Sequence, residues 1–331
     1  MRIGVLGAAR IAPHVVIGPA GRSGYAQVVA VAARDQDRAR EFAERHGIPD
    51  VERNYDALLA RDDLDLVYIA LPNAAHAEWS IRASGNGRAV LCEKPFATCI
   101  EDARSMVAAG TSAAKPVIEA FHYRHHPLVH ALIDMVRSGD IGPLIEAEAS
   151  FVAELPRADA VRWSGSLGGG ALLDLGCYAV HALRSIILAE PVVRSAEAEF
   201  IDGVDAWLRG ELVFAEGVRT RIECSMVAGR RAADLRLRGE RGEIRVENFV
   251  APQLPHRVVV SDARGERVMT FDGPGTFDHQ LDHIRAVLAG ERAALTGGDD
   301  AVANMVAIDA LYAAAGRQAA RSQPTPGMDG S

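Results

Sequence analysis

The sequence predicts an α/β protein with two parts: an N-terminal doubly wound parallel sheet over residues 1–121, and a C-terminal α+β part over residues 122–321 with an open, mainly antiparallel sheet. At 331 residues the chain is longer than one average domain. In its first third, short apolar runs alternate with amphipathic stretches, which is typical of parallel strands joined by helices. Further on, alternating polar and apolar runs are separated by turn residues, which is typical of an antiparallel sheet with one polar face.

The first part is expected to contain at least four strands and three helices. The apolar runs that predict strands are Arg2–Leu6, Val28–Ala33, Asp65–Leu71 and Ala89–Leu91. The amphipathic stretches that predict helices are Asp37–His46, Tyr55–Leu59 and His76–Ser84. Gly47 follows the first of these helices and is a typical helix end, because glycine readily adopts the left-handed conformation required there.

The second part is expected to contain four helices and eight strands. The predicted helices are Pro127–Arg137, Ala171–Leu188, Phe277–Leu288 and Ala301–Ala314. The predicted strands are Ile145–Val152, Glu197–Ile201, Trp207–Phe214, Val218–Cys224, Leu235–Arg238, Glu243–Val246, Val258–Ser261 and Arg267–Phe271. Residues 322–331 are rich in Pro, Gly and Ser and are expected to form a flexible tail.

Composition argues against several classes of partner. The net charge is −8 and no block of Lys and Arg occurs, so a nucleic-acid partner is not expected. We also expect no membrane partner, because no apolar run approaches membrane-spanning length. None of the four cysteines forms a CxxC pair, so we expect reduced, buried thiols and a cytoplasmic protein. The N-terminal residues resemble a first strand rather than a signal peptide.

The turn after the first strand has the pattern of a dinucleotide-binding loop in a Rossmann domain. Gly7–Ala12 fills the place of G-x-G-x-x-G, with alanine at the second and third glycine positions. Gly7 permits the tight turn, and the small Ala9 lets the backbone at Arg10 and Ile11 approach a pyrophosphate. The helix N-terminus that follows favours anionic phosphates. The alternative is an ordinary strand–turn–helix corner, since two of the three glycines are missing.

The end of the second predicted strand favours NADP over NAD. A cofactor without a 2′-phosphate is usually met there by Asp or Glu, whereas this strand ends at Ala33 and is followed by Arg34. A guanidinium binds phosphate through two parallel hydrogen bonds. Arg38, one helical turn further, adds charge. The alternative is that Asp35 binds the ribose hydroxyls of NAD.

Two further loops leave parallel strands at the edge where ligands bind in this architecture. Cys92–Pro95 places Lys94 directly after one strand, and Leu71–Asn73 with His76 follows the strand before it. A lysine at this position is unusual for a solvated charge. His76 taken alone is more simply explained as a residue at a helix start.

Together these residues resemble the glucose–fructose oxidoreductase / inositol dehydrogenase / MocA (Gfo/Idh/MocA) family. The resemblance covers nearly the whole chain. It rests on five segments: Gly7–Ala12, Leu71–Asn73 with His76, Cys92–Pro95, Glu119–Arg124 and Gly168–Tyr178. The combination of Glu-Lys-Pro with Gly-Gly-Gly…Asp-x-Gly-x-Tyr is specific, whereas either half alone would be a modest signal.

The resemblance implies catalytic roles for three residues. Lys94 matches the family's catalytic lysine, which bonds the reacting oxygen. Tyr178 lies where a subgroup of the family carries tyrosine, and it would be the general acid or base. A free tyrosine has a pKa of about 10, and a neighbouring lysine cation is expected to lower the pKa of Tyr178. Asp174 lies on the same helical face and would orient a substrate hydroxyl, with capping of the helix start as the alternative.

The resemblance also implies binding residues. On the cofactor side these are Gly7, Ala9, Arg10, Ile11, Arg34, Arg38, Leu71, Asn73, His76, Glu93 and Lys94. Around the substrate entrance we expect Tyr123, Arg124, Arg162, Trp163 and His181, the last of these more as a supporting residue. The run of histidines from His122 to His126 is not expected to bind a metal, because Pro127 interrupts the helix that would align them.

The leading hypothesis is an NADP-dependent oxidoreductase of the aldose dehydrogenase type. It would move a hydride between nicotinamide and a hydroxyl or keto carbon of a polyhydroxylated small molecule. Alternatives are a reductase of a nucleotide-linked keto-sugar, a trans-dihydrodiol dehydrogenase and a glycosidase with transient redox at the cofactor. A catalytically silent NADP-binding regulator is the alternative outside enzymes, although it would not need both Lys94 and Tyr178. By resemblance we expect a homo-oligomer, a dimer or a tetramer, formed through the exposed face of the antiparallel sheet.

Overall fold

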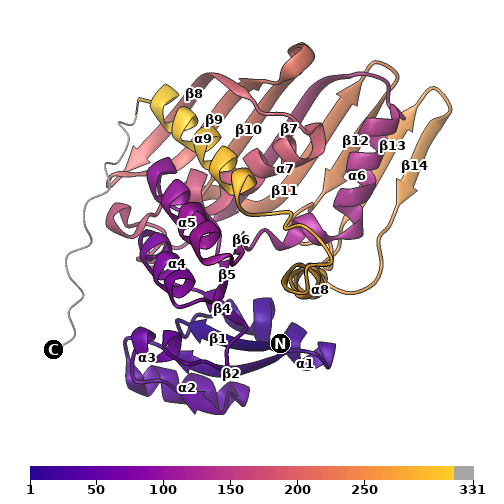
Figure 1. Cartoon of the computed structure of the whole chain (residues 1–331). Helices are drawn as coiled ribbons and strands as arrows, with labels where there is room; N and C mark the ends of the chain where they lie inside the picture. Colours follow the sequence, from indigo (N-terminus) through magenta and orange to yellow (C-terminus); the bar gives the residue numbers. More distant parts are fainter. Residues whose placement is uncertain (317–331) are drawn as a thin grey trace.

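The computed structural model describes residues 1–316 and contains two sheets (Figure 1). The first sheet occupies the lower part of the view, and the larger second sheet the upper part. The tail predicted over residues 322–331 lies outside the described residues. Figure 1 shows helix α8 (Thr276–Leu288) between the two sheets, although it comes late in the sequence.

The first sheet has six parallel strands in the order β3-β2-β1-β4-β5-β6. Their bounds are β1 Arg2–Leu6, β2 Gln27–Ala32, β3 Asp50–Val51, β4 Leu66–Ile69, β5 Ala89–Cys92 and β6 Val117–Glu119. In the register, Leu6 at the end of β1 pairs with Ala32 on one side and Ile69 on the other. The strand order reverses between β1 and β4, and ligands bind at the carboxyl ends of such strands.

Helices connect these strands, as the alternating pattern predicts. They are α1 Gly18–Ser23, α2 Gln36–His46, α3 Tyr55–Leu59, α4 His76–Gly85 and α5 Ile100–Ala113. Gly47 ends α2 with a φ of 66°, as predicted. Strands β3 and β6 and helix α5 were not predicted. The two strands are only two and three residues long, and α5 ends in Gly, Thr and Ser, which weaken its helical pattern.

The second sheet has eight strands in the order β14-β13-β12-β11-β7-β10-β9-β8. Their bounds are β7 Leu144–Glu154, β8 Val192–Ile201, β9 Val204–Val213, β10 Arg219–Ser225, β11 Val227–Gly239, β12 Gly242–Glu247, β13 Arg257–Asp262 and β14 Gly265–Met269. Neighbouring strands are antiparallel except β7 and β10, which are parallel. The prediction of a mainly antiparallel sheet is therefore confirmed.

Helices cover one face of the second sheet, as Figure 1 shows for α6 (Pro127–Ser138), α7 (Cys177–Ile187) and α9 (Asp299–Ala314). The opposite face carries Arg and Glu in facing pairs. Glu146 on β7, for example, accepts from Arg219 at 2.5 Å and from Arg238 at 2.6 Å. Each strand therefore alternates between the core and a charged outer face.

The statement that no apolar run approaches membrane-spanning length was wrong. The stretch Gly165–Ile187 is long and apolar enough to cross a membrane by length and composition, but its apolar window is 94% buried inside the protein. It also includes Asp174 and Arg184, both buried and ion-paired. These features are those of a core helix. The expectation for the cysteines agrees with the structure, in which Cys92, Cys99, Cys177 and Cys224 are free and buried.

Candidate active site

Lys94 and Asp174 form an ion pair where the two parts of the chain meet. Lys94 lies just beyond the carboxyl end of β5, and Asp174 lies in a π-helical turn, η5 (Leu172–Gly176), that leads into α7. The Lys94 ammonium donates to Asp174 Oδ1 at 2.9 Å and to the Asp174 main-chain oxygen at 2.7 Å. Although burial opposes the charge, the carboxylate keeps the pKa of Lys94 above its usual value. Lys94 is therefore a fixed cation.

A second cation binds the other oxygen of Asp174. Arg162 Nε donates to Asp174 Oδ2 at 2.8 Å, and Arg162 also pairs with Asp159. Burial alone would raise the pKa of Asp174, but the charges of Lys94 and Arg162 lower it below its usual value. In this structure Asp174 orients Lys94 and Arg162 supports Asp174, and the expected contacts of Asp174 and Arg162 with a substrate stay predictions. Asp159 was not predicted, and only its spacing three residues before Arg162 could have indicated it.

The turn that carries Asp174 is anchored from the second sheet. Asp205 on β9 accepts the Leu172 N–H at 2.6 Å through one oxygen and the Tyr312 hydroxyl at 2.8 Å through the other. Gly170 precedes the turn with a φ of 126°, and a Cβ there would meet Asp205 Oδ1 at 2.1 Å. Glycine is therefore required at this position, which explains part of the Gly-Gly-Gly motif.

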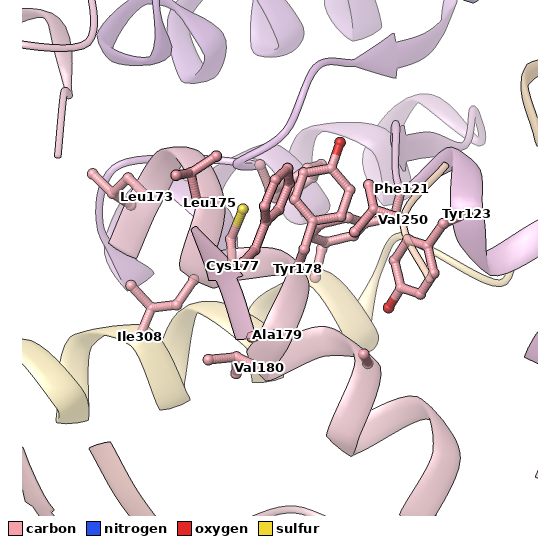
Figure 2. Close-up of a cluster of buried hydrophobic side chains, with 14 of the residues drawn as sticks. Phe121, Tyr123, Leu173, Leu175, Cys177, Tyr178, Ala179, Val180, Val250 and Ile308 are labelled. Carbon is pink, nitrogen blue, oxygen red and sulfur yellow. The ribbon is translucent and has the colours of Figure 1, made fainter. Parts of the chain in front are cut away.

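Tyr178 lies one turn beyond Asp174, beside the Lys94 ammonium. The ammonium is 5.3 Å from the centroid of the Tyr178 ring, which also contacts Phe121 and Phe151 edge-on. Figure 2 shows the Tyr178 hydroxyl pointing to one side of the apolar cluster and the Tyr123 hydroxyl to the other. Burial raises the pKa of Tyr178 well above its usual value. The expectation of a lowered pKa for Tyr178 was therefore wrong, because burial, together with the nearby Glu93 and Asp174, raises it.

His122 is the polar partner of Tyr178, and the sequence did not indicate it. Its Nε2 lies 3.4 Å from the Tyr178 hydroxyl, and its Nδ1 lies 2.8 Å from the hydroxyl of Thr276. The sequence drew attention to this histidine only as part of a run that could be mistaken for a metal site. Among the residues that the structure describes, no group of three or more His, Cys, Asp or Glu side chains is arranged to hold a metal ion.

The loops after β4 and β5 are braced against each other. His76 is fully buried, with Nδ1 2.8 Å from the Pro95 main-chain oxygen and Nε2 3.0 Å from that of Leu71. Glu93 accepts from the Tyr68 hydroxyl at 2.6 Å, and burial raises the pKa of Glu93 above its usual value. In this structure His76 therefore positions the loop that carries Lys94, and has no exposed atom for a cofactor.

The loop after β1 has the shape that a bound pyrophosphate requires. Gly7 has a φ of 100°, and a Cβ there would meet the Ala70 main-chain oxygen at 2.5 Å and the Leu71 side chain at 3.1 Å. Within residues 1–316, the main-chain N–H groups of Arg10 and Ile11 donate no hydrogen bond, and both residues are exposed. These free donors next to a helical N-terminus fit an anionic phosphate.

Two arginines lie at the ribose end of this loop. Arg34 is exposed just beyond β2, and Arg38 Nη2 donates to the Ala8 main-chain oxygen at 2.8 Å, which places its guanidinium beside the loop. Asp35 accepts the N–H groups of Asp37 and Arg38, both at 3.0 Å, and so caps α2. Asp35 is thus used at the start of α2 through Oδ1, and Arg34 and Arg38 are the exposed cations beside the loop.

The substrate side differs from the sequence expectation. Tyr123 and His181 are fully buried and bonded to each other at 2.6 Å, so neither reaches the site surface. Trp163 is 9% exposed, donates to the Leu155 main-chain oxygen and stacks under Arg157. Arg124 is partly buried.

Of the cofactor-side residues, Asn73 donates to the Gly168 main-chain oxygen at 2.8 Å and so links the two parts of the chain.

The chain is similar to known oxidoreductases over most of its length. A D-xylose 1-dehydrogenase (NADP(+)) of Haloferax volcanii is 34% identical in an alignment that covers 95% of this chain and 97% of the relative. A trans-1,2-dihydrobenzene-1,2-diol dehydrogenase of Mus musculus is 34% identical over 72% of this chain and 71% of the relative. Among solved structures, a 3-ketoreductase of Actinomadura kijaniata, in complex with NADP and TDP-benzene, has a TM-score of 0.87 at 28% identity, covering 95% of this chain and 97% of that chain.

Two family models match the sequence. The model of an oxidoreductase family with an NAD-binding Rossmann fold matches residues 1–121. The model of the GFO/IDH/MocA C-terminal domain matches residues 129–245. Together the two matches cover more than half of the chain and include Lys94, Asp174 and Tyr178, and the chain therefore belongs to the Gfo/Idh/MocA family of oxidoreductases.

Proposed function

We propose that this protein is an NADP-dependent oxidoreductase of the aldose dehydrogenase type, in which a hydride moves between nicotinamide and a carbinol or carbonyl carbon of a sugar-like substrate. The observation that carries the proposal is the pairing of Lys94 with Asp174 beside the hydroxyl-bearing ring of Tyr178. A fixed cation and a phenol at the carboxyl ends of parallel strands are the groups that carbonyl reduction and alcohol oxidation need.

The cofactor would be held by the loop after β1 and by the end of β2. The free N–H groups of Arg10 and Ile11 would bind the pyrophosphate, and the exposed Arg34 would bind the 2′-phosphate. A charge-assisted hydrogen bond of this kind contributes about 1.5–3 kcal/mol, enough for a tenfold or larger preference for NADP over NAD.

The two catalytic side chains would divide the work on the substrate oxygen. The Lys94 ammonium would donate a hydrogen bond to that oxygen and stabilise negative charge on it. The Tyr178 phenol, kept protonated by burial, would give its proton to the oxygen during reduction and receive one during oxidation. Asp174 and Arg162 would hold the ammonium in place.

Sugar-like substrates are supported by the relatives, which act on D-xylose, on a trans-dihydrodiol and on a keto-sugar. We favour a free aldose because the relative named for D-xylose matches nearly the whole chain at 34% identity. Partly exposed polar groups near the site, such as Arg162 and Asp159, suit a ligand with several hydroxyls. We further propose a cytoplasmic homo-oligomer, a dimer or tetramer, joined through the charged outer face of the second sheet.

The first test is a fluorescence titration of the purified protein with NADPH and with NADH, beside Arg34→Ala. We expect NADPH to bind at least about tenfold more tightly, and this preference to collapse in the variant. Preference for NADH would contradict the role of Arg34. If neither cofactor binds, the proposal of an oxidoreductase is wrong.

The second test is a substrate panel with NADP⁺ or NADPH. It should include aldoses, a nucleotide-linked keto-sugar and a trans-dihydrodiol, with cofactor absorbance as the readout. Turnover of an aldose with stoichiometric reduction of NADP⁺ supports the proposal. Cleavage of a glycoside without net change of the cofactor would support the glycosidase alternative, and binding without any turnover would support the silent regulator.

A further inference from the structure

A line of side chains leads from the Tyr178 hydroxyl to the protein surface. His122 lies in the short turn η3 (His122–His125) directly after the first sheet and faces Tyr178 through Nε2 at 3.4 Å. Its Nδ1 lies 2.8 Å from the hydroxyl of Thr276, the first residue of α8, and this hydroxyl donates to Gln253 Oε1 at 3.1 Å. His122 and Thr276 are buried, whereas Gln253 is exposed.

The hydrogen bonds along this line determine which nitrogen of His122 carries its proton. The Thr276 hydroxyl has one proton, which it donates to the Gln253 carbonyl oxygen, a group that can only accept. Thr276 must therefore accept from His122 Nδ1, so the Nδ1 atom carries the proton. In a neutral imidazole the Nε2 atom is then a free acceptor, and it faces the Tyr178 hydroxyl.

We propose that His122 is a positioning residue for Tyr178 and the first carrier of a proton relay that runs through Thr276 and Gln253 to the surface. This inference rests on the proposed function, because a relay is useful only if Tyr178 exchanges a proton with substrate at every turnover. The contact of 3.4 Å is long for a hydrogen bond, and such catalytic contacts commonly tighten when substrate is bound.

The relay balances protons in the oxidation direction. The substrate O–H bond breaks and its proton bonds to Tyr178, while the carbinol carbon loses a hydride to NADP⁺. The phenol's own proton passes to His122 Nε2, and the Nδ1 proton of His122 passes to the Thr276 hydroxyl. Thr276 gives its proton to Gln253 Oε1 while Gln253 Nε2 gives one of its protons to bulk water, and proton exchange of the resulting imidic acid with water restores the amide. Reduction runs through the same transfers in reverse.

Burial makes both groups suited to passing a proton rather than holding a charge. It raises the pKa of Tyr178, so the side chain does not rest as a phenolate. It lowers the pKa of His122 to about 3, with a contribution from the charge of Lys94, so the imidazole does not rest as a cation. A relay that receives one proton at Tyr178 and releases another at the surface forms neither a buried phenolate at Tyr178 nor a buried imidazolium at His122.

The geometry can be tested on the protein alone by ¹⁵N NMR of histidine-labelled samples at neutral pH. The His122 signal, assigned by its loss in His122→Ala, should be that of a neutral imidazole protonated at Nδ1. In Thr276→Val this preference should be lost, whereas Thr276→Ser should keep it. A signal from the Nε2-protonated form or from the cation in the wild type would overturn the relay, whether or not the protein turns over any sugar.

The proton transfer can be tested by kinetics in mixtures of H₂O and D₂O with the aldose found in the panel. We expect His122→Ala to lower kcat at least about 100-fold, the lower end for loss of general acid–base assistance, with little change in KM. In the wild type, the dependence of kcat on the D₂O fraction should indicate that several protons move in the transition state. In Thr276→Val it should indicate a single proton. His130→Ala, which removes an exposed histidine of α6, is the matched control.

Rescue of His122→Ala separates a relay from simple packing. Imidazole has two nitrogens and should restore turnover, whereas N-methylimidazole fills the same space but cannot pass a proton through. Equal rescue by both, or unchanged kcat and isotope effect in His122→Ala, would overturn the relay. Absence of any cofactor-dependent turnover in the wild type would instead contradict the proposed function, and the NMR result would still decide the relay geometry.

Discussion

At the residue scale, the site depends on one carboxylate that two cations share. Asp174 binds Lys94 through one oxygen and Arg162 through the other, and its side chain is only 11% exposed. A buried carboxylate that loses one partner is left partly uncompensated, which is unfavourable in a low-dielectric site. The position of the Lys94 ammonium, on which its proposed use on a substrate oxygen rests, therefore depends on Arg162 as well as on Asp174.

Removal of the ammonium should abolish most turnover and leave the fold intact. In Lys94→Ala, Asp174 retains Arg162 as a partner, so we expect a small change in the thermal midpoint. We expect kcat to fall at least about 100-fold, measured with the aldose identified in the panel. The chain has one other lysine, Lys115, which is exposed, and Lys115→Ala is the matched control. Wild-type turnover in Lys94→Ala would rule out the proposed mechanism.

Loss of the second cation should move the acid limb of the pH–rate profile. Burial raises the pKa of Asp174, and Lys94 and Arg162 lower it, so Arg162→Leu should raise it. Because the ionised carboxylate is the form that holds Lys94, kcat should begin to fall at a higher pH, by about one to three units. Arg157→Leu, which removes a neighbouring exposed arginine, should leave the limb in place. An unchanged limb in Arg162→Leu would mean that Asp174 does not control the profile.

At the element scale, two connections carry the site. The turn after β1 approaches β4 so closely that only glycine fits, and the turn η5 is anchored to β9 by Asp205. In the first contact, the turn before a helix lies against Ala70, directly after β4. In the second, the start of η5 is bonded to Asp205 near the start of β9. The apolar clusters on either side of the first sheet then hold the strands in register.

Substitution of Gly7 should affect stability and cofactor binding together. In Gly7→Ala the new Cβ would lie 2.5 Å from the Ala70 main-chain oxygen, at a φ of 100°. We expect the free energy of unfolding to fall by at least about 1–3 kcal/mol, measured by denaturant titration, and NADPH binding to weaken. Gly21→Ala, in the exposed helix that follows, has no atom within 4 Å of its Cβ and is the control. Normal binding in Gly7→Ala would contradict the proposed role of this turn.

The contact between α7 and α9 should make the second part sensitive to acid. Burial raises the pKa of Asp300, but His181 and Arg184 on α7 lower it to about 2. Burial also lowers the pKa of His181, so at neutral pH Arg184 is the cation that faces Asp300. A lowered carboxyl pKa stabilises the folded state above the unfolded value, near 4, and this stabilisation is lost as the pH falls towards 2.

Asp300→Asn should therefore flatten the pH dependence of stability. We expect the wild type to lose about 2 kcal/mol more than the variant between pH 5 and pH 2, as measured by denaturant titration at a series of pH values. Asp299→Asn changes the exposed neighbouring carboxylate and should retain the wild-type slope. A slope in Asp300→Asn equal to that of the wild type would show that this contact does not contribute.

At the scale of the whole molecule, the site is built from both sheets. Lys94 comes from the first sheet, whereas Asp174 and Tyr178 come from the helix that covers the second. Asn73 bonds to Gly168 across the same junction. A cofactor bound at the first sheet therefore lies against groups from the second part, and its binding energy should stabilise both.

Cofactor binding should raise the thermal midpoint of unfolding. At a free NADPH concentration about 100 times Kd, mass action stabilises the folded state by about 2.7 kcal/mol. For a chain of this size we expect a rise of several degrees, measured by calorimetry, and a much smaller rise in Arg34→Ala at the same concentration. An equal rise in the variant would contradict the use of Arg34 in binding.

Most of the framework could be predicted from the sequence, because it depends on local patterns. Strand periodicity placed β1, β2, β4 and β5 to within a few residues, and the end of α2 follows from the glycine at Gly47. Three elements were not predicted. Strands β3 and β6 have only two and three residues and so show no periodicity, and helix α5 has residues of low helix propensity near its end. Their formation depends on pairing with strands already present.

The sequence by itself determined the type of fold and the segments that bring Lys94, Asp174 and Tyr178 to one site, since these depend on strand ends and on helical spacing. Only the tertiary structure decided what each group does there. In the folded protein Asp174 binds two cations, and Asp35 caps helix α2. Tyr123 and His181 are hydrogen-bonded to each other in the core. It also placed His122 against Tyr178. The physical reason is that hydrogen-bond partners and burial arise between segments far apart in the chain, and these set the charge of each group.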